Sequence, residues 1–141
     1  MKIILQQISV ATLDPIQVID ITADVEHALE KAGIRDGLVT LISPHTTAHV
    51  NLNEREEMLQ RDMVKYLSDL VPQRGDYLHN RAPVDGRDNA HAHLMGLFMN
   101  ATETIPISGG KLMLGGWQSV FFIELDGPRS ERRILAQFLG S

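Results

Sequence analysis

The chain contains no cysteine among its 141 residues. This absence excludes disulfide bonds, thiolate zinc sites and cysteine nucleophiles together. Any metal ion would therefore have to be bound by histidine, carboxylate or amide ligands. The sequence directs attention to its six histidines and to the carboxylates that the fold could bring to them.

Basic residues are also scarce. The chain has 13 Lys and Arg against 18 Asp and Glu, which gives a formal net charge of −5. Nonspecific nucleic-acid binding needs many clustered basic residues to neutralise phosphates. The one dense basic group, Arg129, Arg132 and Arg133, is large enough for one small anion but not for a duplex. No nucleic-acid partner is expected.

Long hydrophobic runs are absent as well. No apolar run approaches the roughly 20 residues that a membrane-spanning helix needs. Residues 1–10 contain a single basic residue and no small-residue cleavage site, so they resemble a strand and not a secretory signal. These features predict a cytoplasmic protein without a membrane partner.

What the sequence does contain is the composition of one folded domain. Hydrophobic residues make up 43% of the chain and charged residues 22%, as in ordinary globular proteins. The length lies near the commonest size for one domain. We therefore expect a single domain over residues 1–141.

The hydrophobic patterns predict an α+β fold. Alternating or β-branched segments indicate about eight strands, joined mostly by short turns that favour antiparallel pairing. Helical spacing predicts two or three helices, at residues 23–32, 54–70 and 92–99. Between the last two helices, residues 73–89 form a long polar segment that is either functional or poorly ordered.

The strongest predicted strand covers residues 117–126. Its alternation places Trp117 and Phe121 on an apolar face expected in the core, and Gln118, Glu124 and Asp126 on the opposite face. Charges on a central strand are costly to bury unless they are paired. The two carboxylates therefore need a cation.

Two interpretations of these carboxylates remain open. Their partner is Arg129, a protonated histidine or a metal in a functional site. Alternatively, both lie at the solvent-exposed end of the strand and pair with Arg132 or Arg133.

Four of the histidines lie in suggestive positions. His45 follows Pro44 at a break between strands, which favours a functional role. His49 lies about 13 Å further along an extended chain, so the two cannot bind one ion without a bulge. We expect His49 to be a packing or surface residue. His91 and His93 would share one side of an extended segment, a common metal arrangement, but would point nearly oppositely on a helix. In that case at most one is a ligand.

His79 is a lone histidine in the polar segment 73–89. Such a residue is usually only solvated, and the sequence alone does not show what lies near it.

Five ordered motifs resemble the YjbQ family, which is often labelled secondary thiamine-phosphate synthase. These motifs span most of the chain, and Tyr77-Leu78-His79 also matches a family position. They are Pro44-His45-Thr46-Thr47-Ala48, Asn53-Glu54, Asn89 with His91-Ala92-His93-Leu94, Leu114-Gly115-Gly116-Trp117-Gln118, and Glu124-Leu125-Asp126-Gly127-Pro128-Arg129.

The resemblance implies an antiparallel β-sandwich with two to three helices, assembled as a homotrimer, with a polar pocket near a subunit boundary. It implies catalytic roles for Gln118, Glu124, Asp126 and Arg129, and metal ligation by His45, His79 and His93. The sequence departs from the family pattern at Gly116, where Thr is usual, and at His49, where a small residue is usual.

The activity implied by the resemblance is a weak thiamine-phosphate synthesis, which joins a pyrimidine pyrophosphate to a thiazole phosphate. A divalent metal, zinc or magnesium, is the implied cofactor, although histidine ligands suit zinc better than magnesium. Two alternatives stay open: a metal-dependent hydrolase of a small phosphorylated metabolite, and a non-catalytic protein that binds a small anion.

Overall fold

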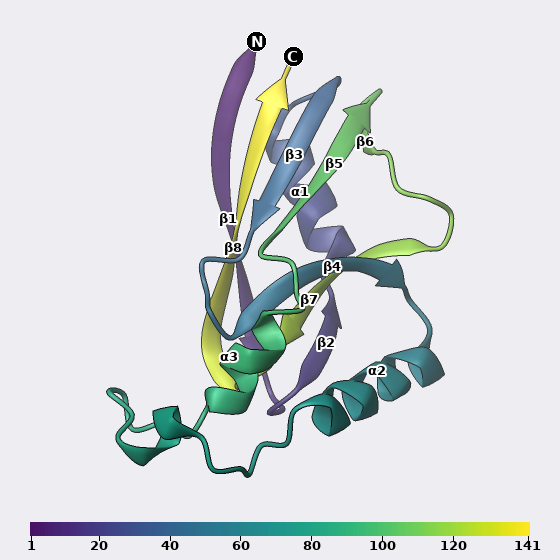
Figure 1. The fold of residues 1–141 in the computed structure, drawn as a ribbon. Helices are drawn as coiled ribbons and strands as arrows, with labels where there is room; N and C mark the ends of the chain where they lie inside the picture. The colour runs from purple at the N-terminus through teal and green to yellow at the C-terminus, as the bar shows by residue number, and fades with distance from the viewer.

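Two antiparallel sheets and three α-helices make up the computed structural model, which describes all residues 1–141 (Figure 1). The strands are β1 (Lys2–Thr12), β2 (Gln17–Asp20), β3 (Gly37–Ile42), β4 (Ala48–Glu54), β5 (Thr102–Ser108), β6 (Lys111–Leu112), β7 (Gln118–Glu124) and β8 (Arg129–Gly140). The helices are α1 (Thr22–Ala32), α2 (Glu57–Leu70) and α3 (Ala90–Gly96), and a 3-10 turn, η1, covers Leu78–Arg81.

The strands form a five-stranded sheet in the order β1-β8-β3-β5-β6 and a three-stranded sheet in the order β2-β7-β4. All pairings are antiparallel, and Lys2 opposite Gly140 brings the two termini side by side (Figure 1). The expected α+β class with an antiparallel sandwich and three helices is confirmed.

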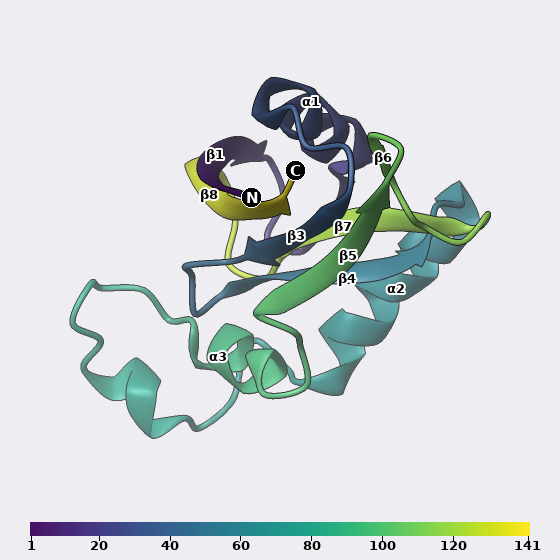
Figure 2. The same cartoon turned by 90° about the horizontal axis from the view of Figure 1, so that it is seen from above.

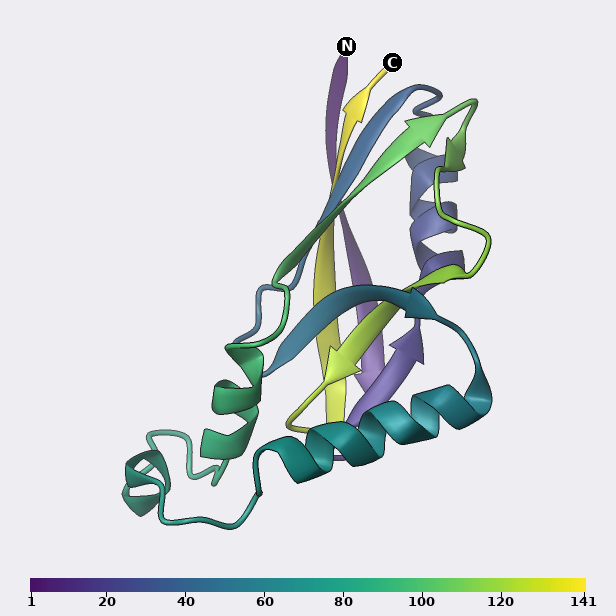
Figure 3. The same cartoon turned by 45° about the vertical axis from the view of Figure 1, so that its right-hand side comes forward.

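The main hydrophobic core lies between the two sheets and beneath α1. Residues from both sheets meet there, with Phe138 of β8 and Phe122 of β7 among the largest. A second cluster lies on the other side of the three-stranded sheet, where Phe121 of β7 meets Leu67 of α2 and Met95 of α3. Figures 2 and 3 show the consequence: α1 lies on one side of the molecule, and α2 and α3 lie on another.

Strand β7 is therefore covered on both faces. Phe122 faces the main core and Phe121 faces the second cluster. Trp117, expected in the core, is instead 80% exposed because β7 begins only after it, at Gln118. The expectation of one core face and one half-polar face was wrong for this strand, because α2 and α3 cover the face of Phe121 while the face of Phe122 packs in the main core between the sheets.

The helix boundaries differ from the predicted ones at their starts. Strand β4 continues to Glu54, so α2 begins only at Glu57 and not at residue 54. Its cap is Glu56, whose carboxylate accepts hydrogen bonds from the backbone N–H groups of Met58 and Leu59. Helix α3 begins earlier than predicted, at Ala90. None of the helices has the length and apolarity needed to cross a membrane.

Alanine substitutions test the two-sided burial of β7. Phe121→Ala and Phe122→Ala should each lower the free energy of unfolding by about 3–5 kcal/mol, because both leave a core cavity. Trp117→Ala serves as the control and should cost less than about 1 kcal/mol. Urea denaturation followed by circular dichroism measures all three. A small effect of either phenylalanine substitution would show that one face of β7 is not core.

Candidate functional site

The two carboxylates predicted to belong to the site lie at the corner where β7 ends and β8 begins. Glu124 is the last residue of β7, and Arg129 is the first residue of β8, after the Gly127-Pro128 turn. This short connection places Glu124, Asp126, Arg129 and Arg132 around one corner of the molecule. Two separate arginine–carboxylate groups form there.

The first group is the buried pair of Glu124 and Arg132. Arg132 donates from Nε to Oε2 of Glu124 at 2.8 Å and from Nη2 to Oε1 at 2.6 Å. The hydroxyl of Thr12 donates to Oε2 of Glu124, and the backbone N–H of Asp126 donates to Oε1, each at 2.9 Å. Arg132 also donates to Thr47 at 2.8 Å. Both oxygens of Glu124 are thus engaged, and its side chain is fully buried.

Burial alone would raise the pKa of Glu124, but the hydrogen bonds from Arg132 and Asp126 and the charge of Arg132 outweigh it, so its pKa is lowered. Glu124 is ionised, and both of its carboxylate oxygens already accept hydrogen bonds within the chain. This arrangement gives it the role of holding the corner together, with no oxygen directed at a ligand.

The second group, which we call the Asp126 cluster, consists of Arg87, Asn89, Asp126 and Arg129. Arg87 donates to Oδ2 of Asp126 at 3.0 Å and to Oδ1 at 3.1 Å. Arg129 donates to Oδ2 at 2.8 Å, and Asn89 donates to the same oxygen at 2.9 Å. Both arginines also donate to the backbone carbonyl of Asp126, each at 3.0 Å.

Burial would raise the pKa of Asp126, yet the hydrogen bonds from Arg87, Asn89 and Arg129 lower it. The carboxylate is therefore ionised, and two guanidinium charges surround it. One positive charge remains in excess in the Asp126 cluster.

Asn89 connects this cluster to His79. The amide nitrogen of Asn89 donates to Asp126, which leaves its Oδ1 to face Nε2 of His79 at 3.0 Å. Because an amide oxygen only accepts, Nε2 of His79 must carry the proton. The neutral ring then has its lone pair on Nδ1. Asp126 therefore sets the tautomer of His79 through Asn89, and the polar segment 73–89 is tied to the corner.

His93 lies beside His79, and its ring meets the ring of His79 edge to face with a centroid separation of 5.0 Å. The two rings line a cavity of about 500 Å³ together with Tyr77, Leu78 and Leu94. His91 does not join them. Helix α3 begins before His91, so the condition under which His91 and His93 diverge is met.

His45 is held apart from this pair. Its Nε2 accepts a hydrogen bond from the backbone N–H of Arg133 at 3.0 Å, which places the proton of the neutral ring on Nδ1. Burial and the charge of Arg132 lower the pKa of His45, so the neutral ring is favoured. Neither nitrogen then has a free lone pair, and no hydrogen bond links His45 to His79 or His93.

Gln118 is the first residue of β7, about 20 Å along the strand from Glu124 at its other end, and Asp126 lies just beyond that end. Its Oε1 accepts a hydrogen bond from the backbone N–H of Gly115 at 2.8 Å, so it closes the local turn. Gly116 is exposed, and a Cβ there would meet nothing within 4 Å. The structure therefore places neither residue beside the Asp126 cluster.

His49 is buried, as expected for a packing residue, and neither ring nitrogen has a hydrogen-bond partner. Its ring lies against Gly96 at the end of α3, where a Cβ would come within 2.8 Å of Nε2 of His49. Glycine at position 96 makes room for the imidazole.

The sequence prediction omitted two residues that organise the site, Arg87 and Asn89. Both belong to the polar segment 73–89, and no periodicity pointed to either residue. Asn89 stood in one of the family motifs, which was the available signal. No three His, Asp or Glu side chains converge so as to hold one metal ion.

Comparisons with known proteins agree with this architecture. The family model described as UPF0047 protein YjbQ-like matches residues 6–141. A UPF0047 protein from Methanothermobacter thermautotrophicus is 38% identical over 132 residues, covering 94% of this chain and 90% of that protein. The UPF0047 protein YugU from Bacillus subtilis is 31% identical over 127 residues, covering 89% and 92%.

Solved structures show the same fold. A YbjQ-like protein of unknown function from Sulfolobus solfataricus is 38% identical, with a TM-score of 0.91 and coverage of 99% of both chains. An uncharacterised conserved protein of the yjbq/upf0047 family from Clostridium acetobutylicum is 37% identical, with a TM-score of 0.85 and coverage of 95% and 99%.

The buried pair can be tested by breaking it from one side. Glu124→Gln should lower the free energy of unfolding by about 3–5 kcal/mol, because Arg132 would remain charged and buried without a counter-ion. The double variant Glu124→Leu with Arg132→Met should be more stable than Glu124→Gln. Urea denaturation provides the comparison. Equal stability of wild type and Glu124→Gln would contradict the assignment.

The lowered pKa values also predict an acid dependence of stability. In acid the unfolded chain binds more protons than the folded one at Glu124 and Asp126. Their stabilisation is complete above the unfolded-state pKa values of about 4 and is lost as the pH falls through the folded-state values. Urea midpoints across this range should fall less steeply for Asp126→Asn than for wild type. Parallel curves would argue against the ionised cluster.

Proposed function

Because the chain belongs to the YjbQ family of UPF0047 proteins, we propose that it binds a small phosphorylated metabolite at the Asp126 cluster and the His79–His93 pair. The observation that carries this proposal is the excess positive charge beside Asp126. The side chains of Arg87 and Arg129 are 37% and 29% exposed, so a ligand can reach both.

The hydrogen-bonding capacity of the two arginines supports an anionic ligand. Each uses Nε and Nη2 to hold Asp126, and the Nη1 group of each makes no hydrogen bond within the chain. A guanidinium has five N–H donors, and its planar fork matches phosphate oxygens. Asp126 thus orients the two cations without exhausting them.

The adjoining cavity suits the organic part of such a metabolite. Its walls include Tyr77, Leu78, Ala90 and Leu94, and its volume of about 500 Å³ falls within the range of small-molecule sites. His79 and His93 lie on the same walls, next to the Asp126 cluster through Asn89. A phosphate on the arginines would leave an attached ring to fill this cavity.

The reaction that we propose is the coupling implied by the family label. The ring nitrogen of a thiazole phosphate attacks the methylene carbon of a pyrimidine pyrophosphate. A C–N bond forms, the C–O bond breaks, and pyrophosphate leaves with the electron pair. Such a displacement depends mainly on stabilising the negative charge of the leaving group, which Arg87 and Arg129 are placed to do. In its imidazolium form, His79 can donate a proton from Nδ1 to a leaving-group oxygen and so return to the Nε2–H tautomer that Asn89 holds.

A divalent metal fits this site incompletely. A catalytic zinc usually has three protein ligands, and one chain offers at most His79 and His93 here, since His45 is engaged elsewhere. The oxygens of Asp126 are taken by arginines and Asn89, which leaves little for magnesium. The proposed coupling is therefore assigned to protein side chains alone, without a metal ion.

We also propose the homotrimer implied by the family. Large apolar side chains are exposed at Leu78, which lines the cavity, and at Leu97 and Phe98, which follow α3. Their burial between copies would explain this exposure. Light scattering should give about three times the monomer mass of 15.7 kDa, and a monomeric mass would refute this part of the proposal.

Site variants test binding and turnover separately. Arg129→Gln should weaken the binding of inorganic pyrophosphate about tenfold in calorimetry, because one charge-assisted donor is lost. His79→Ala should largely retain that binding but reduce thiamine-phosphate formation by about a hundredfold or more.

Matched controls lie far from the site. Arg35→Gln and His27→Ala change exposed residues outside the Asp126 cluster and should leave both measurements unchanged. Binding without any coupling would refute the transferase proposal in favour of a binding protein. Release of phosphate without coupling would favour a hydrolase. Unaltered binding in Arg129→Gln would refute the location of the site.

A further inference from the structure

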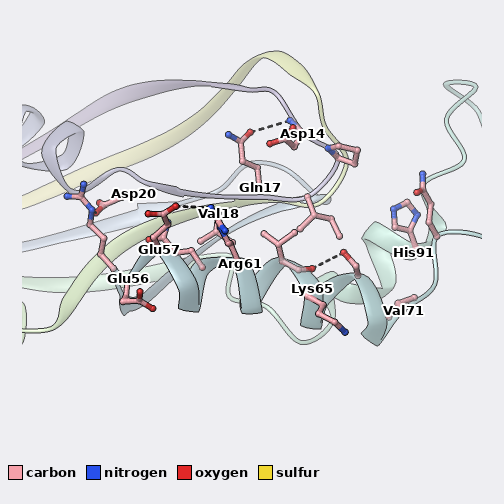
Figure 4. A pocket seen from close by; sticks show the side chains of 17 residues that line it. Asp14, Gln17, Val18, Asp20, Glu56, Glu57, Arg61, Lys65, Val71 and His91 are labelled. Carbon is pink, nitrogen blue, oxygen red and sulfur yellow. Dashed lines mark hydrogen bonds and ion pairs between the residues drawn. The ribbon is translucent and has the colours of Figure 1, made fainter.

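The surface around α2 is an ordinary charged protein surface. A groove of about 1040 Å³ lies between β2 and α2, and Figure 4 shows Glu57, Arg61 and Lys65 on its helix side. Arg61 lies 2.9 Å from Glu57, and Lys65 lies 2.6 Å from Asp69. His91 also lines this groove. Exposed ion pairs of this kind are stable in water and need no partner molecule.

The outer face of the five-stranded sheet is different. Helix α1 and the main core pack against the inner face of this sheet, whereas α2 and α3 pack against the second cluster on the other sheet. Figures 1 and 2 show α1 behind the five-stranded sheet and α3 below its lower end. The outer face is left open, and Ile3 and Leu5 of β1 are exposed on it.

The strand register arranges the outward side chains in three rows across β1, β8, β3 and β5. The row nearest the chain termini consists of Ile3, Leu139, Leu38 and Pro106. The next two rows begin at Leu5 and Gln7 and hold only Leu, Ile, Gln and Thr. Charge returns in the row after these, where Arg133 lies opposite Ser9. The outer face thus has an uncharged centre and a charged border.

Such a face is unusual for a sheet in contact with water. An antiparallel sheet with one wet face normally alternates apolar residues inward with polar residues outward. Here aliphatic side chains point outward as well as inward, and a contiguous exposed apolar surface marks an interaction site.

Strand β1 gives a second, independent indication. It is the edge of the sheet, yet from Ile3 to Thr12 it contains neither a charged residue nor a proline. Natural edge strands usually carry such residues because they prevent pairing with other chains. The outer face and its edge are therefore both built to be covered.

We propose that copies of this chain associate through the outer face of the five-stranded sheet, which would then be the interface of the homotrimer on which this inference rests. In a closed ring of three copies, the three outer faces turn toward the common axis. Ile3, Leu5 and Leu139 are then removed from water, and this burial drives the association.

The chemistry of the outer face favours a second copy over another kind of partner. A nucleic acid, an anionic membrane or a charged peptide would find no counter-charge there. A second copy brings an equally uncharged face, so no charge is buried without a partner. The polar side chains of the face are threonines and glutamines, such as Thr40 and Gln137. These groups both donate and accept hydrogen bonds, so those of one copy can pair with those of the next.

The outer face also continues into the apolar surface already assigned to the trimer. Leu97 and Phe98 are exposed and precede β5, whose first residue, Thr102, ends the third row. The backbone N–H of Ser43 donates to the carbonyl of Ala101 at 2.8 Å, which holds this segment against the end of β3. A copy on the outer face would therefore reach Leu97 and Phe98 as well.

A lysine at the centre of the outer face tests the proposal. Leu5 is 61% exposed in the single chain, so Leu5→Lys should fold normally, but association would bury its charge without a partner. Light scattering over a dilution series should show that Leu5→Lys raises the concentration for half-dissociation by more than about tenfold. Met58→Lys is the matched control, because Met58 on α2 is 64% exposed. It should assemble like wild type.

Thiol labelling measures the burial of the face directly. The chain has no cysteine, so Gln137→Cys adds a single thiol to the middle row, and Ser68→Cys adds one to the exposed side of α2. Gln137→Cys should react with a maleimide more slowly than Ser68→Cys. Combining Gln137→Cys with Leu5→Lys should restore fast labelling.

The outcomes separate this inference from the proposed trimer. A trimeric wild type whose mass is unchanged by Leu5→Lys would overturn the location of the interface and leave the trimer standing. Fast labelling of Gln137→Cys in the assembled protein would do the same. A wild type that is dimeric through this face would refute the trimer alone, and a monomeric wild type would refute both.

Discussion

Glu124, the last residue of β7, is buried in its ionised form. A buried carboxylate is tolerated only when its oxygens are fully paired. Four hydrogen bonds provide this pairing, two from Arg132, one from Thr12 and one from the backbone of Asp126. These donors come from β1, β8 and the β7–β8 turn. The need to neutralise one charge therefore fixes where three segments meet.

The rest of the candidate site depends on this corner. With Glu124 and Arg132 in place, the backbone directs Asp126 outward, where Arg87, Asn89 and Arg129 converge on it. Asn89 then orients His79. The positions of the surface groups therefore depend on the core. The buried pair of Glu124 and Arg132 sets the position of Asp126, and Asp126 orients His79 through Asn89. Preorganisation of this kind allows charged groups to act on a ligand without first rearranging.

The fold could be read from the sequence to a large extent, because strand alternation and helical spacing are local properties. The strands and their antiparallel pairing follow from these patterns and the short turns, whereas the sandwich of two sheets was implied by the family resemblance. Trp117 was misplaced because alternation assigns a residue to one face of a strand but does not show where the strand begins, and β7 starts only after Trp117.

The site was predicted less completely, for a physical reason. Glu124, Asp126 and Arg129 are neighbours in sequence, so their need for pairing could be recognised. Arg132 was named only as part of an alternative, yet it proved to be the partner of Glu124. Arg87 lies 39 residues before Asp126 and comes from a segment without periodicity, so only the folded chain brings it there. The hydrogen bond of His45 to the backbone of Arg133 is equally nonlocal, with a separation of 88 residues.

Helix α3 has only seven residues, Ala90–Gly96, and it turns His93 toward one cavity and His91 toward another. Seven residues make about two helical turns, so His91 and His93 are held in one short hydrogen-bonded unit. Occupancy of one cavity that shifts this helix would alter affinity at the other, and thermodynamic reciprocity would make the two effects equal in size. The seven residues thus connect the two cavities, because His93 lines one of them and His91 lines the other.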